Sequence, residues 1–238
     1  MLKLHGVTKY YSNTAALQNV DLELDRGEVV GLFGANGAGK TTLLKCTMGL
    51  LDPNDGWPIL DGDELHPNAY EKLSFITEEG SYFPDISPLA HGEFYSKILP
   101  RFNTGRYMQL LDFFQLEHKK KARALSRGQR AKLEIAIGMS RGADFILMDE
   151  PFLGKDIFTR RDFLKLMIAM LQPHEGIIIA THQIEEIEMF ITRAIVMHEG
   201  KIVANQQIDA LEEGLSNFIQ KICGYDGSRV LEFTDCST

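Results

Sequence analysis

The chain has 238 residues, 44% of them hydrophobic, which is enough for one sizeable core with a smaller attached lobe. Its formal net charge is −8, and such an acidic chain is poorly suited to a nucleic acid partner held through its phosphates. The three cysteines form no CxxC pair and the longest apolar runs are too short to span a bilayer, so we expect a cytoplasmic chain without a disulfide framework, a zinc site or a membrane-spanning segment.

The first third of the chain alternates strand patterns with a glycine-rich turn. Apolar and polar side chains alternate over residues 2–7 and 18–25, as they do in half-buried strands. EVVGLF, residues 28–33, is a compact apolar run typical of a buried strand. The expected elements are strands at 2–7, 18–25, 28–33, 57–62 and 73–77, with a glycine-rich loop and a helix over about 39–50 after the third strand.

Residues 85–142 have a helical pattern without an obvious strand, and prolines punctuate the beginning of this stretch. We expect it to be a helical insertion. Continuous apolar strands separated by helices then follow, and they predict an α/β fold with a mainly parallel sheet that is covered on both faces. The elements expected here are strands at 144–149 and 176–181, helices at about 157–171, 183–190 and 208–222, and a hairpin over 193–205 that turns at Glu199-Gly200.

The segment GANGAGKTT fits the pattern G-x-x-x-x-G-K-[ST] and lies between a buried strand and a helix, as a phosphate-binding (Walker A) loop does. The backbone N–H groups of such a loop surround phosphate oxygens. Lys40 would add charge at the β- and γ-phosphates, and Thr41 would offer a hydroxyl ligand to Mg²⁺. The residues that we expect to hold the nucleotide are Asn36, Gly37, Ala38, Gly39, Lys40, Thr41 and Thr42.

Two carboxylates stand at the end of the buried strand FILMD, where open α/β sheets bind their ligands. We expect Asp149 on the Mg²⁺ side and Glu150 to polarise an attacking water, a solvated acidic turn being the alternative. His182 ends the next strand, which favours a contact with the γ-phosphate over a purely structural role. Asp156 lies just beyond the acidic pair, where the plain interpretation is a helix N-cap.

The stretch ALSRGQRAKLEIAIG, residues 124–138, has the chemistry of a helix start. Ser126 and Gln129 stand three apart, which is the capping-box pattern. Because the free N–H groups of a helix start attract anions, this stretch is a second anion-seeking site, far along the chain from the phosphate loop.

Five stretches, GANGAGKTT, ALSRGQRAK, ILMDEP, GKD and ATHQ, occur in an order that resembles the nucleotide-binding subunit of ATP-binding cassette (ABC) transporters. The resemblance covers residues 2 to about 215, and the ALSRGQRAK stretch separates this family from other P-loop proteins. It implies a P-loop core with an N-terminal antiparallel β subdomain and a helical insertion subdomain. The chain would be a single ABC ATPase domain over 1–238, with its core in 1–84 and 143–238 and its helical subdomain in 85–142.

The resemblance also implies roles for individual residues. Tyr11 is similar to the aromatic residue that stacks on adenine, although Tyr10 is adjacent and either tyrosine is also suited to packing against a strand. His182 corresponds to the family's switch histidine, which would act with Glu150 and Lys40 in catalysis. Asp156 resembles the residue that communicates across a dimer of subunits.

Three residues of the second helix start would face the γ-phosphate of ATP held by another subunit, namely Ser126, Gly128 and Gln129. Two departures from the family stand out. Glu78 occupies the place of a glutamine that meets Mg²⁺, where it would join Thr41 and Asp149. Arg127 replaces a glycine, and its side chain either points to solvent or adds charge near the phosphate.

The function that the resemblance implies is ATP binding and hydrolysis, with ATP and Mg²⁺, coupled to transport. Two nucleotide-binding subunits would pack head to tail, as a homodimer or a heterodimer, and drive a separate transmembrane permease. The chain would then be peripheral on the inner face of the cell membrane, and similarity to small bacterial exporter ATPases favours export over import. The alternatives are a soluble non-transport ABC ATPase and an ATP-binding regulatory subunit.

Overall fold

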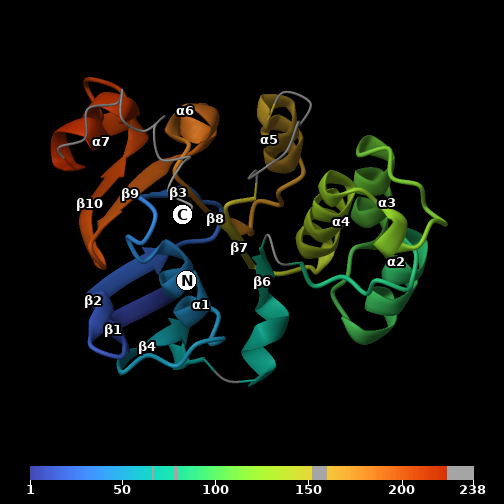
Figure 1. Ribbon diagram of the computed structural model, residues 1–238, viewed down its shortest axis with the longest axis horizontal. Helices are drawn as coiled ribbons and strands as arrows, with labels where there is room; N and C mark the ends of the chain where they lie inside the picture. Colours follow the sequence, from blue (N-terminus) through green and yellow to red (C-terminus); the bar gives the residue numbers. More distant parts are fainter. Residues whose placement is uncertain (66, 78–79, 152–159, 224–238) are drawn as a thin grey trace, which may run out of the picture.

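The computed structural model describes residues 1–65, 67–77, 80–151 and 160–223 (Figure 1). Its strands are β1 (Leu2–Tyr11), β2 (Thr14–Leu24), β3 (Val29–Phe33), β4 (Asp55–Leu60), β5 (Asp63–Glu64), β6 (Leu73–Ile76), β7 (Phe145–Asp149), β8 (Gly176–Thr181), β9 (Arg193–His198) and β10 (Lys201–Gln207). Its α-helices are α1 (Lys40–Thr47), α2 (Pro88–Ile98), α3 (Thr104–Phe113), α4 (Arg127–Ser140), α5 (Arg160–Ala169), α6 (Ile184–Ile187) and α7 (Leu215–Cys223), and short 3-10 helices lie at Pro67–Lys72, Ala122–Ala124, Glu188–Phe190 and Ile208–Ala210.

The core sheet has the strand order β10-β9-β3-β8-β7-β6. Every neighbouring pair from β9 to β6 is parallel, and only β10 runs antiparallel, to β9. The β9–β10 hairpin turns at Glu199 and Gly200, which both have positive φ as a tight hairpin turn requires. The expected mainly parallel α/β fold is therefore confirmed.

Residues of the core strands alternate between two apolar clusters, one on each face of the sheet. Val30 and Leu32 of β3 join the cluster that includes β1, β2 and α1. Val29 and Phe33 of the same strand join the other cluster, with α5, α7 and the helices before β7. This double burial explains why the core strands are continuous apolar runs rather than alternating ones.

A second, antiparallel sheet with the order β2-β1-β4-β5 contains the N-terminal strands (Figure 1). Its inward-facing leucines pair across the strands, as Leu2 does with Leu24 and with Leu60. These side chains are almost fully buried in the same cluster as α1. The expected antiparallel β layer is thus present, and β1 extends to Tyr11, beyond the predicted strand end.

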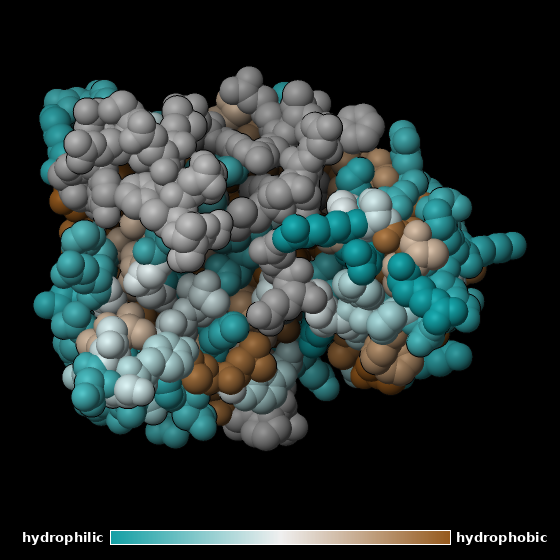
Figure 2. Space-filling view, viewed as in Figure 1, coloured by the Kyte–Doolittle hydropathy of each residue, from teal (hydrophilic) through white to brown (hydrophobic). Residues whose placement is uncertain are grey.

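Helices α2, α3 and α4 form a separate lobe beside β6 (Figure 1), in the stretch where a helical insertion was expected. Each begins at a polar N-cap: Ser87 accepts from Ala90 N, Asn103 accepts from Arg106 N, and Ser126 begins α4. On the face in Figure 2, hydrophilic side chains dominate the outer surface of this lobe, and hydrophobic ones gather near the end of α1 and along the lower edge of the lobe.

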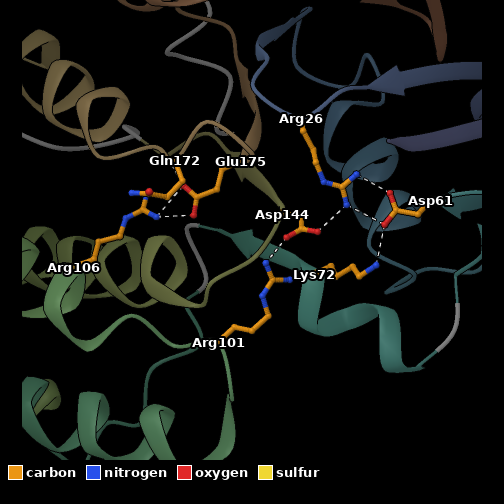
Figure 3. Close-up of polar contacts among 8 residues, drawn as sticks. All are labelled: Arg26, Asp61, Lys72, Arg101, Arg106, Asp144, Gln172 and Glu175. Atoms are coloured by element: carbon orange, nitrogen blue, oxygen red, sulfur yellow. Dashed lines mark hydrogen bonds and ion pairs between the residues drawn. The ribbon is translucent and has the colours of Figure 1, made fainter.

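Ion pairs fasten this lobe to the core at the edge where the parallel strands begin (Figure 3). Arg101, between α2 and α3, contacts Asp144 directly before β7, and Arg26 before β3 contacts the same carboxylate at 2.8 Å. Arg26 and Lys72 also hold Asp61 of the antiparallel layer, at 2.7 and 2.9 Å. One charged network therefore links both layers and the helical lobe.

A second pair at this edge, Arg106 with Glu175, is almost entirely buried (Figure 3). The Nη1 atom of Arg106 lies 2.7 and 2.9 Å from the two carboxylate oxygens, and Gln172 N donates to the same carboxylate. Arg106 belongs to α3 and Glu175 precedes β8, so this pair also joins the lobe to the core.

The final helix is shorter than predicted. We expected it to run over 208–222, but α7 begins at Leu215, directly after Gly214, which has φ +77°. A positive φ at that glycine interrupts a right-handed helix, so only a 3-10 turn forms at Ile208–Ala210. Among the described residues, no helix is long and apolar enough to cross a membrane.

Candidate active site

The phosphate loop lies between β3 and α1, as the sequence pattern predicted. Two of its glycines are required by space as well as by conformation. Gly34 has φ +158°, and a Cβ there would lie 2.5 Å from Met197 O. Gly39, the N-cap of α1, has φ +104°, and a Cβ there would lie 2.6 Å from Ala16 O. Glycine at these two positions lets the loop backbone take the close turn that a phosphate-binding loop needs.

Lys40 lies under this loop and is only 6% exposed. Its Nζ donates to Gly34 O at 2.7 Å and to Ala35 O at 3.3 Å, and lies 3.8 Å from Glu150 Oε1. Burial lowers the pKa of Lys40, while the charges of Glu150 and Asp149 act in the opposite direction. Phosphate oxygens can replace these carbonyls as acceptors for Lys40 Nζ, because a charged donor forms its stronger hydrogen bonds with charged acceptors.

Asp149 ends β7 close to Thr41 at the start of α1. Burial raises the pKa of Asp149, and a hydrogen bond with Thr41 opposes that rise. Its Oδ1 atom is buried without a hydrogen-bond partner. A buried acceptor without a donor beside a hydroxyl fits a hard cation with oxygen ligands, so these residues suit Mg²⁺.

The described residues contain no group of three or more histidine, cysteine, aspartate or glutamate side chains that would hold a metal by themselves. Mg²⁺ is commonly bound through one or two carboxylates together with the phosphates of its nucleotide.

Glu150 and His182 meet at the ends of adjacent strands. Glu150 Oε1 lies 2.9 Å from His182 Nδ1, and Glu150 N donates to Ala180 O of β8 at 2.9 Å. Glu150 has φ +44°, an uncommon conformation for a residue other than glycine. Such backbone strain is concentrated at functional sites, and it directs this carboxylate to the histidine and to Lys40.

Helix α4 begins with a complete capping box. Gln129 N donates to Ser126 Oγ at 3.2 Å, and Ser126 N donates to Gln129 Oε1 at 2.9 Å. A Cβ at Gly128 would meet nothing within 4 Å, and the Arg127 side chain is exposed. The predicted helix start is therefore present, with an open approach at Gly128.

Tyr10 and Tyr11 lie at the end of β1, where they are 48% and 51% exposed. Tyr10 pairs with Ala15 of β2, and the next residue, Ala16, presents its carbonyl oxygen to Gly39. The exposed tyrosines thus stand close to the phosphate loop, as an adenine-stacking role requires. Glu78 and Asp156, to which we assigned a metal contact and a dimer contact, lie outside the described residues.

One buried polar residue of this region was missed from sequence. Glu134 of α4 is 3% exposed and binds Ser81 with both carboxylate oxygens. A charged residue inside the run LEIAIGMS, where every other position is apolar or small, was the available signal.

A phosphate loop between a strand and a helix, an acidic pair at the end of β7 and a histidine at the end of β8 define a P-loop nucleoside triphosphatase. The family model described as ABC transporter matches residues 17–153, more than half of the chain. The chain therefore belongs to the ABC transporter family, as its sequence motifs indicated. Within that family it is an ATP-binding subunit with the ATPase domain.

Known proteins agree with this assignment. The chain is 28% identical to the ABC transporter ATP-binding protein YtrB of Bacillus subtilis, over 81% of this chain and 67% of that protein. It is 29% identical to the lipopolysaccharide export system ATP-binding protein LptB of Haemophilus influenzae, over 78% of this chain and 82% of that protein. The dimeric structure of MJ0796, a bacterial ABC transporter cassette, has the same fold, with a TM-score of 0.75 at 24% identity, over 87% of this chain and 98% of that one.

Proposed function

We propose that two copies of this chain bind ATP and Mg²⁺ between them, hydrolyse the ATP, and use the resulting cycle of closing and opening to drive export through a separate transmembrane partner. The observation that carries this proposal is the separation of the two anion-seeking helix starts. Helix α1 packs against β7 in the core, whereas α4 belongs to the helical lobe and packs against β6 at the edge of the core sheet (Figure 1). A second copy would bring its α4 start to the phosphate loop of the first.

Each residue of the site has a distinct part in this proposal. Lys40 and the loop N–H groups hold the phosphates, and Glu150 polarises the attacking water, while His182 orients the Glu150 carboxylate and contacts the γ-phosphate. Thr41 and Asp149 would hold Mg²⁺, which neutralises charge that develops on the phosphates. The partner copy would supply Ser126, Gly128 and Gln129 at the γ-phosphate.

Exposed apolar side chains support a protein partner. Leu50 after α1 is 61% exposed, and in the helical lobe Phe83, Phe94 and Ile98 are 43%, 38% and 52% exposed. Figure 2 shows hydrophobic surface in both of these regions. A transmembrane partner that covers such side chains would attach this single-domain chain to the inner face of the membrane. Similarity to LptB, whose name describes an export system, supports export over import.

A soluble ATPase without a membrane partner and a regulatory subunit without hydrolysis are the competing functions. The contact between Glu150 and His182 favours hydrolysis, because a subunit that only binds ATP has no need for a positioned base. Gentle extraction from native membranes, followed by sequencing of co-purifying proteins, tests the partner directly. A co-purifying multispanning protein supports the transporter function, and full recovery in the soluble fraction without one contradicts it.

The shared site is tested by complementation. Lys40→Ala and Ser126→Glu chains should each be inactive alone, because each lacks one half of both sites in its own dimer. Co-expression of the two should restore part of the ATPase activity, since a mixed pair has one intact Lys40 facing one intact Ser126. If mixed pairs form and remain inactive, the site does not lie between copies of this chain.

A further inference from the structure

One face of α4 contacts the end of β6 and two residues further along the chain, Ser81 and Tyr82. Gly138 comes so close to Ile76 that a Cβ there would meet that side chain at 2.3 Å. One helical turn earlier, Glu134 binds Ser81, and a further turn earlier, Arg130 Nη1 reaches Tyr82 Oη at 3.5 Å. The spacing of four residues places these three positions on one stripe of the helix.

The Glu134 carboxylate is almost fully buried on this stripe, although its partner Ser81 is exposed. Ser81 N donates to Glu134 Oε2 at 2.7 Å, and Ser81 Oγ donates to Oε1 at 2.8 Å. Burial raises the pKa of Glu134, and the two hydrogen bonds from Ser81 act against that rise. Burying a carboxylate costs free energy unless donors bind its oxygens, so the presence of Glu134 here calls for a reason beyond packing.

Ser81 and its neighbours are fastened to the helical lobe from the other side as well. Tyr95 of α2 donates its hydroxyl to Ser81 O at 3.3 Å. Phe83 N donates to the buried ring of His91, also in α2, at 2.8 Å. Residues 81–83 are therefore held by α2 and α4 together, although the chain has only just left the core sheet.

The core end of this connection lies at the catalytic carboxylates. Ile76, the last residue of β6, pairs with Met148 of β7, so the chain leaves β6 beside Asp149 and Glu150. Five residues after Ile76 the chain is bound to Glu134 of α4, and the same helix begins at the Ser126 capping box. Helix α4 thus connects Ser81, which follows β6, to the Ser126 helix start that faces the second copy in the proposed function.

We propose that Glu134 is a positioning residue for ATP hydrolysis. By binding Ser81, it keeps the start of α4 in a fixed position relative to the end of β6, which lies beside the acidic pair. This inference rests on the proposed function of the site. Glu134 acts through Ser81 and α4 and does not touch the nucleotide. Loss of the contact should therefore impair turnover while the phosphate loop still binds ATP.

The test compares Glu134→Ala, Glu134→Gln and Leu133→Ala in phosphate-release kinetics, with hydrogen exchange at residues 80–84. Glu134→Ala should lower kcat about tenfold or more, the loss expected for a hydrogen bond to a charged group, with KM changed little. The Ser81 amide should exchange faster. Glu134→Gln should recover most of kcat, because its amide oxygen still accepts from Ser81 N and its NH₂ reaches Ser81 Oγ.

Leu133→Ala is the matched control, because Leu133 is fully buried and joins the apolar cluster instead of Ser81. It should lower Tm without lowering kcat of the folded protein. An unchanged kcat in Glu134→Ala, an equal loss of kcat in Leu133→Ala, or no recovery in Glu134→Gln would overturn the positioning role. Absence of ATPase activity in the wild-type chain would instead overturn the proposed function together with this inference.

Discussion

His182 Nδ1 lies 2.9 Å from Glu150 Oε1, and the same oxygen lies 3.8 Å from Lys40 Nζ. One carboxylate oxygen therefore stands between a histidine from β8 and a lysine from the phosphate loop. Because a carboxylate oxygen only accepts, His182 donates to it through Nδ1. The histidine thereby fixes the direction of the Glu150 side chain.

His182→Ala should lower kcat about tenfold to a hundredfold, because Glu150 loses the hydrogen bond that orients it. ATP affinity should fall less than kcat, since the phosphate loop is untouched and only the His182 contact with the γ-phosphate is lost. Steady-state phosphate release and nucleotide titration measure the two effects separately. His198→Ala is the control, because that side chain is 42% exposed at the end of β9. Equal kcat values for both variants would remove His182 from the mechanism.

Lys40→Ala should weaken ATP binding by roughly tenfold to a hundredfold, the cost of losing hydrogen bonds from a charged donor to phosphate. Binding of a fluorescent ATP analogue measures the loss. Lys201→Ala, at an exposed position of β10, should bind as tightly as the wild type. Unchanged binding by Lys40→Ala would show that the nucleotide lies elsewhere.

The phosphate loop, the acidic pair and the capping box could be predicted because each depends on residues close together in the sequence. Lys40, Thr41 and the glycines occur within one motif, and its flanking strand and helix are marked by local patterns. The position of His182 at the sheet edge that carries the acidic pair followed from a rule of topology, since the ends of neighbouring parallel strands meet at one edge. Its contact with Glu150 was not predicted.

The contacts that fasten the helical lobe could not be predicted. Glu134 and Ser81 are 53 residues apart, and Arg106 and Glu175 are 69 apart. No local pattern indicates which distant charge or hydroxyl a buried ion will meet, because that depends on how the lobe packs on the sheet. Likewise, the left-handed conformation of Gly214 was not apparent, so the last helix was predicted to begin too early.

Arg106→Leu should lower the free energy of unfolding by about 3–5 kcal/mol, because it leaves the Glu175 carboxylate buried without its cation. Urea denaturation measures the change. Replacing both residues with leucine should recover most of the loss, since no unpaired charge then remains. Lys120→Ala, which breaks an exposed pair with Glu117, should change stability by no more than about 0.5 kcal/mol. A double variant as unstable as Arg106→Leu would contradict the ion-pair explanation.

Stability in acid should depend on Asp144. Burial alone would raise the pKa of Asp144, but hydrogen bonds from Arg26 and Arg101 outweigh it and hold the pKa below the ordinary value of 3.8. The stabilisation is therefore fully present above pH 3.8 and is lost as the pH falls through the lower folded-state pKa. The free energy of unfolding, measured by denaturation at a series of pH values from neutral downwards, should fall less steeply with pH for Asp144→Asn than for the wild type. Identical acid profiles would show that Asp144 does not contribute.

The central claim is that Glu150 activates the water that attacks ATP bound between two copies of the chain. Glu150→Gln keeps the size of the side chain and removes the base. Phosphate release and size-exclusion chromatography on that variant with ATP and Mg²⁺ test the claim most directly. We predict that turnover falls by about a hundredfold or more and that an ATP-dependent dimer accumulates. Normal turnover, or loss of turnover with a chain that stays monomeric in ATP, would contradict it.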